Sequence, residues 1–155
     1  MTAETSQAYT YVLDEPVRIL VTDDDPIQRE FATVYLSTPH ASVETEDCGE
    51  ACLARLLKEK FDVALIDIDM PGIGGFETIR RIREMEAFDD LPIIVVTGRE
   101  DIDSIDRAFR LGATSFVVKP VNWRLLSYQI RYVIRAGSRS GMAPRDARVT
   151  PQAAA

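Results

Sequence analysis

The chain has 155 residues, of which 46% are hydrophobic and 28% charged, and it carries a formal net charge of −7. This composition fits one water-soluble globular domain, and it excludes a membrane span because no apolar run reaches the roughly 18 residues that such a helix needs. The N-terminal segment has neither the basic nor the apolar region of a signal peptide, so we expect a cytoplasmic protein.

Short apolar runs alternate with amphipathic stretches along most of the chain. This alternation is typical of βαβ units, which build a parallel sheet covered by helices on both faces. We therefore expect an α/β, doubly wound fold with five parallel strands. The second run, SVETE, alternates apolar and polar residues and is expected at an edge of the sheet. The expected strands are 17–21, 42–46, 63–66, 92–96 and 115–119.

The stretches between these runs have the apolar spacing of helices. Pro26 suits the first turn of a helix, Gly112 suits a helix end, and Asn122 can cap the last helix. The expected helices are 26–37, 49–60, 76–85, 101–111 and one that begins at 123. We expect a flexible arm over residues 1–15, the folded domain over 16–137 and a disordered tail over 138–155, where no apolar period is found.

Polar side chains follow four of the expected strands. Right-handed crossovers bring the carboxyl ends of parallel strands to one edge of the sheet, where ligands bind in this architecture. Carboxylates gathered there repel one another unless a cation lies among them, and an all-oxygen donor set suits Mg²⁺. A single acid after a strand is more often a helix cap, but the joint pattern favours a site. Its expected members are Asp23, Asp24, Asp67, Thr97 and Lys119.

Asp67 lies at the centre of this group, at the end of the run VALI and before the turn residues DMPGIGG. An ionised aspartate is an oxygen nucleophile, and phosphoryl transfer to it requires a metal and fixed positive charge. We expect Asp67 to be the phosphoacceptor, with Asp23 and Asp24 holding the metal. Lys119 would pair with Asp67 or with the phosphoryl group, and Thr97 would donate a hydrogen bond to a phosphoryl oxygen.

Four motifs in this order, ILVTDDDP, LIDIDMPGIGGFE, PIIVVTG and GATSFVVKP, closely resemble the response regulator receiver domain (CheY-like) of two-component signal transduction. The resemblance implies a five-stranded flavodoxin-like fold and Mg²⁺-dependent transfer of phosphate to Asp67. The donor would be the phosphohistidine of a histidine kinase or a histidine phosphotransfer protein. The backbone carbonyl of Asp69 would be a further metal ligand, and the domain would be a self-modifying phosphoprotein of a phosphorelay rather than an enzyme.

The resemblance also implies a switch. Thr97 would move toward the phosphoryl group and Phe116 would turn inward, although a ring at Phe116 is equally compatible with plain core packing. These changes would remodel the face made by the fourth helix, the last strand and the last helix, around residues 99–110 and 123–135. A downstream protein, or a second copy of the chain, would bind this face.

Asp69 and Arg99 stand two residues after the expected acceptor and two residues after Thr97. Side chains at these places border the path of the hydrolytic water in proteins that this chain resembles. We therefore expect an ion pair between Asp69 and Arg99 that alters the lifetime of the phosphate.

The C-terminal part of the chain differs in charge from the rest. Residues 1–120 carry 12 Lys/Arg against 24 Asp/Glu, whereas residues 121–155 carry six Arg against one Asp. Arg131, Arg135 and Arg139 are spaced to share one helix face, which is either a solvated face or an anion-binding ridge for an acidic partner or a cyclic dinucleotide. The overall negative charge disfavours nucleic acid as a partner.

A haloacid dehalogenase-type phosphatase is a further alternative, because Asp67-Ile68-Asp69 fits the DxD nucleophile motif of that family. Such enzymes place another acidic pair after the lysine, whereas here the pair comes first and only Asp146 follows Lys119. The segment after the last helix is too short for an output module, so we expect either a single-domain regulator or part of a longer one.

Overall fold

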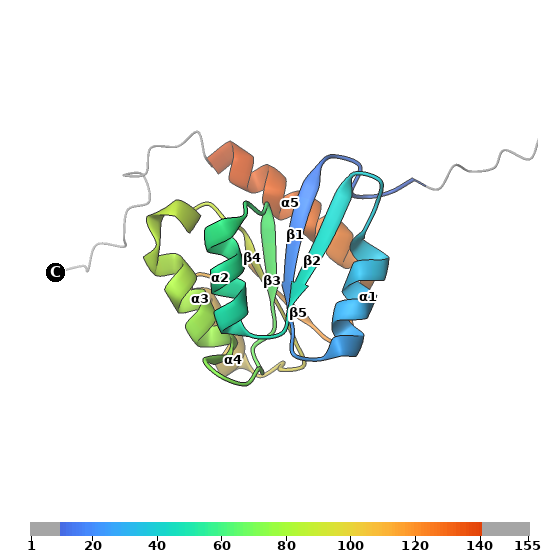
Figure 1. Cartoon of the computed structure of the whole chain (residues 1–155). Coiled ribbons are helices and arrows are strands. Elements are labelled where there is room, and N and C mark those ends of the chain that lie inside the picture. The colour runs from blue at the N-terminus through green and yellow to red at the C-terminus, as the bar shows by residue number, and fades with distance from the viewer. Residues whose placement is uncertain (1–9, 141–155) are drawn as a thin grey trace, which may run out of the picture.

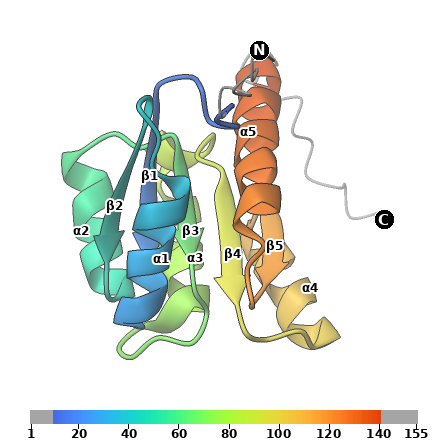
Figure 2. The same cartoon turned by 90° about the vertical axis from the view of Figure 1, so that its right-hand side faces the viewer.

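The computed structural model describes residues 10–140, with side chains to residue 137. Its five strands form one parallel sheet in the order β2-β1-β3-β4-β5, and helices cover both faces (Figures 1 and 2). This confirms the expected doubly wound fold and the edge position of the second strand. The elements in chain order are β1 (Val17–Thr22), α1 (Pro26–Leu36), β2 (Ala41–Glu46), α2 (Gly49–Lys58), β3 (Val63–Ile66), α3 (Gly74–Glu84), η1 (Glu86–Phe88), β4 (Ile93–Thr97), α4 (Ile102–Leu111), β5 (Ser115–Val118) and α5 (Trp123–Ser140).

Two layers of apolar side chains hold the sheet between the helices. One layer packs β1, β3 and β4 against α1 and α5, and the other packs the opposite face against α2, α3 and α4. In Figure 1, α2 and α3 lie in front of the sheet and α5 passes behind it. Because the central strands are buried on both faces, they read as continuous aliphatic runs in the sequence.

The helix ends follow the local signals in the sequence. Pro26 opens α1, and the side chain of Asn122 accepts a hydrogen bond of 3.0 Å from the backbone N–H of Leu125 at the start of α5. Gly112 ends α4 in the left-handed region, with φ of 113°. The third helix begins at Gly74, two residues earlier than expected, so the glycine pair after the turn belongs to the helix.

The structure differs from the expected flexible arm over residues 1–15. Val12 and Leu13 are only 7% and 3% exposed, and Leu13 belongs to the core layer under α1 and α5. The Thr38 hydroxyl donates a hydrogen bond of 2.7 Å to the carbonyl of Leu13, which fixes the segment against the turn between α1 and β2. The inner part of the predicted arm is therefore part of the folded domain, whereas residues 1–9 lie outside the described residues.

The last helix also extends further than predicted, because α5 continues to Ser140. Residues 141–155 of the predicted tail lie outside the described part of the chain. Between residues 10 and 140, no helix combines the length and the apolar character that crossing a bilayer requires.

The burial of Leu13 can be tested with two substitutions of the same chemistry. We expect Leu13→Ala to lower the free energy of unfolding by about 2 to 5 kcal/mol, because it removes buried apolar volume. Leu57→Ala, at a side chain that is 68% exposed, should change it by less than about 0.5 kcal/mol. Urea unfolding followed by circular dichroism measures both, and equal effects would contradict the packed position of Leu13.

Candidate functional site

Three acidic side chains meet at the carboxyl end of the sheet. Asp23 and Asp24 follow β1 and Asp67 follows β3, and these strands are paired neighbours. One carboxylate oxygen from each residue lies within 4.8 Å of the others. Asp23 and Asp67 are buried, at 4% and 6% exposure, whereas Asp24 is open to solvent. The structure therefore brings together the acids that the sequence predicted.

Lys119 places its ammonium group between two of these acids. Its Nζ lies 2.7 Å from Asp23 Oδ2 and 3.2 Å from Asp67 Oδ2. Burial works to lower the pKa of Lys119, but the hydrogen bond to Asp23 and the charge of Asp67 outweigh it and raise that pKa. The lysine therefore stays charged and offsets part of the repulsion among the carboxylates.

The surroundings of Asp67 disfavour the ionised form of its carboxyl group. Burial raises the pKa of its carboxyl group above the ordinary value, and the neighbouring Asp23 adds to this. The charge of Lys119 and a hydrogen bond from Thr97 act in the opposite direction without cancelling the rise. Thr97, which ends β4, is fully buried, and its hydroxyl oxygen accepts a hydrogen bond of 3.4 Å from the backbone N–H of Arg99.

The glycine pair at the start of α3 lets this helix begin against the backbone of Asp67. A Cβ atom on Gly75 would lie 2.2 Å from the Asp67 carbonyl oxygen, so no other residue fits there without moving the backbone. The Gly75 N–H donates to the Ile68 carbonyl at 2.9 Å. The second glycine of the pair thus fixes the position of the backbone that carries Asp67.

The expected ion pair between Asp69 and Arg99 is present. Arg99 Nη2 lies 2.7 Å from Asp69 Oδ1, and Arg99 Nε lies 2.9 Å from the same oxygen. The same guanidinium donates to the Ser104 hydroxyl at 3.4 Å and lies 5.9 Å from the centre of the Phe76 ring. Arg99 thus joins the loop after the acceptor to α3 and to the first turn of α4.

Two contacts of Asp23 were not predicted from the sequence. Arg29 of α1 donates to the Asp23 carbonyl at 2.8 Å, and the backbone N–H of Asp25 donates to Asp23 Oδ1 at 2.9 Å. Asp25 in turn caps α1 by accepting from the Ile27 N–H. The start of α1 therefore holds Asp23 in place. The only signal of this contact in the sequence was Arg29, a basic residue six positions after Asp23.

Phe116, the predicted aromatic switch, is partly buried on β5 and packs against the core layer under α4. It does not belong to the acid site itself.

The predicted arginine ridge is less basic than the sequence indicates. Arg131 lies 5.2 Å from the ring centre of Tyr128, and both Arg131 and Arg135 line a small hollow. Asp14 and Glu15 from the N-terminal segment line the same hollow. The side chain of Arg139 lies outside the described residues. Acids and arginines thus share this surface, which does not favour a site for nucleotide phosphates.

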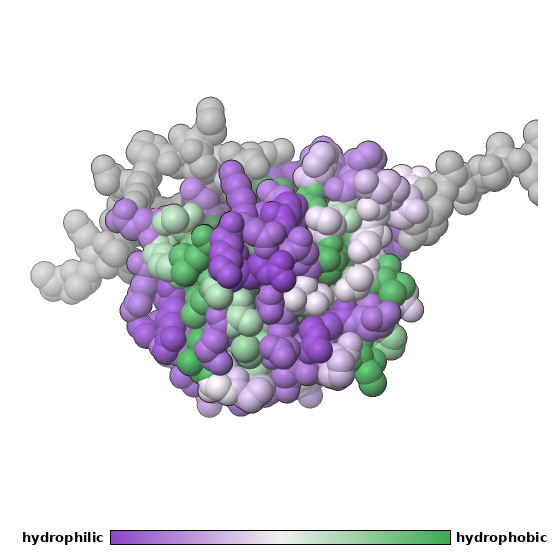
Figure 3. Space-filling view, in the orientation of Figure 1, coloured by the Kyte–Doolittle hydropathy of each residue, from purple (hydrophilic) through white to green (hydrophobic). Residues whose placement is uncertain are grey.

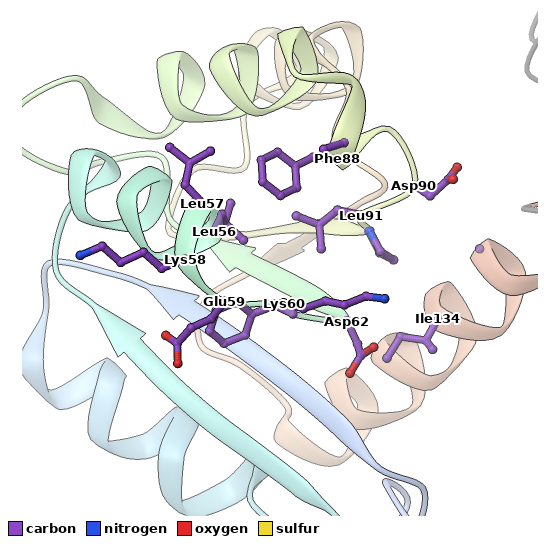
Figure 4. A pocket seen from close by; sticks show the side chains of 14 residues that line it. Leu56, Leu57, Lys58, Glu59, Lys60, Asp62, Phe88, Asp90, Leu91 and Ile134 are labelled. Carbon is purple, nitrogen blue, oxygen red and sulfur yellow. The ribbon is translucent and has the colours of Figure 1, made fainter.

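A hollow of about 540 Å³ lies at the opposite end of the sheet (Figure 4). The last turn of α2, the segment before β4 and the C-terminal part of α5 line it, with Leu57, Phe88 and Ile134 among the apolar walls. Its rim carries both lysines and acids. It adjoins the amino ends of β3 and β4 and takes no part in the acid site, which lies at their carboxyl ends.

The donor set at the acid site fits Mg²⁺. Its carboxylates are hard oxygen ligands, and the exposed side of Asp24 leaves room for the waters that this ion usually keeps. A cation there would oppose the two effects that raise the pKa of Asp67, which are first its burial and then the charge of Asp23.

A doubly wound sheet with an acid cluster, a lysine and a hydroxyl at its carboxyl edge defines a class of signalling domain. The sequence model of the response regulator receiver domain matches residues 19–131, and the chain belongs to this family. Receiver domains bind Mg²⁺ at such an acidic cluster and act as phosphoacceptor switches.

Individual relatives agree with this assignment. The chain is 35% identical over 119 residues to the heme response regulator HssR of Staphylococcus aureus, covering 77% of this chain and 52% of that protein. The chain thus spans about half the length of the curated relatives that it matches. A CheY-like receiver domain protein from Methanospirillum hungatei superposes with a TM-score of 0.76 at 27% identity, covering 82% of this chain and 100% of that one. CheY4 of Vibrio cholerae gives 0.72 at 29% identity, covering 76% and 98%.

Neutralising one acid should separate metal binding from general charge effects. We expect Mg²⁺ to raise the melting temperature of the wild type, because ligand at about 100 times its Kd adds about 2.7 kcal/mol of stability. Asp24→Asn should lose most of this rise, since it removes a member of the cluster. Asp25→Asn removes the same charge one residue away but keeps a capping side chain, so it should retain the rise. Equal responses of the two variants would contradict the assigned cluster.

Proposed function

We propose that Asp67 of this domain accepts a phosphoryl group from a phosphohistidine donor and that the modified domain signals through protein contacts. Asp23, Asp24, Asp67 and the backbone carbonyl of Asp69 would hold Mg²⁺. The observation that carries the proposal is the bridging position of Lys119, which is bonded to both Asp23 and Asp67 beside the acid cluster. Lysine at this point supplies the fixed positive charge that phosphoryl transfer to a carboxylate requires.

Each side chain has a defined part in this reaction. An Asp67 oxygen attacks phosphorus, the bond from phosphorus to the donor imidazole breaks, and the imidazole leaves with the electron pair. Mg²⁺, when bound, neutralises charge on the phosphoryl oxygens. Lys119 exchanges its contact with Asp67 Oδ2 for one with a phosphoryl oxygen, and the buried Thr97 hydroxyl donates to another. Water would later attack phosphorus, breaking its bond to the Asp67 oxygen and releasing inorganic phosphate, which restores the carboxylate. The domain would thus be a phosphoacceptor rather than an enzyme with a separate substrate.

The helix that follows the acid pair offers a surface for the donor. Four large apolar side chains of α1 are between 43% and 61% exposed, and apolar side chains gather over α1 in Figure 3. The ring of Tyr35 stacks on the ring of Trp123, with 5.7 Å between the ring centres. Trp123 follows Lys119 by four residues in the chain. An exposed apolar patch beside the acceptor fits the helical surface of a cytoplasmic histidine kinase or histidine phosphotransfer protein. The four residues are Ile27, Phe31, Val34 and Tyr35.

The face formed by α4, β5 and α5 is the proposed output surface. Thr97 ends the strand beside β5, and Phe116 lies on β5 itself, so movement at the acceptor would reach this face through adjacent strands. Large apolar side chains are exposed on both helices, which supports binding of a downstream protein or of a second copy of the chain. They are Ile102, Phe109, Leu125, Tyr128 and Tyr132.

Phosphotransfer to Asp67 is tested by intact mass after incubation with Mg²⁺ and acetyl phosphate. We expect the wild type to gain one phosphoryl group, and we expect no gain without Mg²⁺ or in Asp67→Asn, because the amide is not a nucleophile for this transfer. Asp103→Asn is the matched control, since it removes the same charge from an exposed residue of α4 outside the acid cluster and should still gain the group. A gain in Asp67→Asn would contradict the assignment, and turnover of small phosphate monoesters would favour the phosphatase instead.

The ion pair of Arg99 with Asp69 should slow loss of the phosphoryl group, because it covers one side of the acceptor loop. The pair is about half exposed, so its effect is expected to be modest. Arg99→Ala should speed dephosphorylation by about two- to fivefold, a range that corresponds to less than about 1 kcal/mol. The rate is measured by following the phosphorylated mass after the donor is removed.

Arg107→Ala provides the matched control for this measurement. Arg107 lies over the same Phe76 ring, 4.2 Å from its centre, and no ion pair to Asp69 is found for it among the described side chains. Its removal should leave the rate near that of the wild type. If Arg99→Ala also leaves the rate unchanged, the ion pair does not control phosphate lifetime.

A further inference from the structure

The loop between Asp69 and Ile73 connects the acid site to a residue of α2 that sequence motifs did not indicate. Glu50, in the first turn of α2, accepts a hydrogen bond of 2.8 Å from the backbone N–H of Ile73. The loop also contacts Arg99 near its start, through the side chain of Asp69. A side chain of α2 and a side chain of the loop between β4 and α4 therefore hold the two ends of this loop.

Gly72 is explained by this contact. Its φ of 77° lies in the region that favours glycine, and a Cβ atom there would lie 2.6 and 2.7 Å from the two carboxylate oxygens of Glu50. The carboxylate therefore lies directly against the Gly72 backbone. The positive φ favours glycine at 72, and the Glu50 carboxylate occupies the space that a side chain would need.

The base of Glu50 is itself fixed against α3. A Cβ atom on Gly49 would lie 2.0 Å from Thr78 Oγ1 and 2.9 Å from the Ile73 side chain, so the two helix starts are in close contact. The Thr78 hydroxyl donates to the Gly74 carbonyl at 2.7 Å. Glu50 thus projects from a buried helix contact rather than from a free surface, although its own side chain is exposed.

We propose that Glu50 is a positioning residue for the metal site: by holding Ile73 and Gly72, it fixes the loop whose Asp69 carbonyl would contact Mg²⁺. The inference rests on the proposed function, because it concerns the same loop and the same ion. Groups that orient a metal ligand directly typically change metal affinity by about 10- to 100-fold when removed. Glu50 acts four residues away from that carbonyl, so a smaller effect is expected.

The test combines metal affinity with a probe of the loop. Trp123, the only tryptophan, lines a small cavity with Asp23 and Asp67, so its fluorescence can report Mg²⁺ binding. Glu50→Ala should weaken Mg²⁺ binding about three- to tenfold. It should also speed hydrogen exchange of the Ile73 amide, which loses its acceptor. At saturating Mg²⁺, the rate of phosphorylation by acetyl phosphate should match that of the wild type, because Glu50 contacts no reacting group.

Two further variants separate the hydrogen bond from the charge. Glu50→Gln keeps an oxygen acceptor and should restore both the affinity and the slow exchange. Glu84→Gln removes one charge from α3, where its only described ion pair is with Arg80, and should change neither reading.

Three outcomes would overturn the proposal. Wild-type Mg²⁺ affinity in Glu50→Ala would show that the loop needs no such support. Equal weakening in the Ala and Gln variants would assign the effect to charge alone. Absence of Mg²⁺ binding in the wild type would overturn the proposed function together with this inference, which distinguishes it from the first two results.

Discussion

Repulsion among three carboxylates within 4.8 Å of one another is the constraint on which the rest of the site depends. The order of the strands determines which side chains can reach these carboxylates. Asp23 and Asp67 follow adjacent strands, β1 and β3, and Thr97 ends the next strand, so short side chains suffice at all three places. β5 lies two strands from β3, a separation of about 10 Å, and only a long side chain can bring charge across the end of β4. Lysine meets this need with a compact ammonium that can contact both acids, at 2.7 and 3.2 Å. Side-chain length at each strand end thus follows from the position of the strand in the sheet.

This relation explains why the site could be predicted from the sequence. Strands that are buried on both faces appear as continuous apolar runs, and crossovers of one hand bring their carboxyl ends together. The polar residues at or just after the ends of four of these runs are therefore candidate members of the site. Local signals were equally informative where one residue decides the backbone, as at Pro26, Gly112 and Asn122.

Contacts made across elements were not predictable in the same way. Leu13 precedes the first strand in a segment without helical or strand period, yet its side chain packs in the core, and the Thr38 hydroxyl satisfies its carbonyl. Glu50 and Arg29 look like ordinary polar residues of amphipathic helices, and their contacts depend on where those helices begin relative to the sheet. The arginine spacing on α5 carried no information about Asp14 and Glu15, which line the same hollow as Arg131 and Arg135.

The loop after Asp67 is held differently at its two ends, and this asymmetry bears on how the proposed switch would reach its output face. At Ile73 the loop is hydrogen-bonded to Glu50 of α2, and the start of α2 packs closely against α3 at Gly49, so both helices oppose displacement of this end. At Asp69 it is bonded to Arg99, a long and about half-exposed side chain that also contacts Ser104 of α4. Charge added at Asp67 acts on Arg99, which already feels the Asp67 carboxylate, more readily than on the packed end. The less constrained side leads to α4, and the proposed output face therefore lies on the side of the acceptor where the structure resists displacement least.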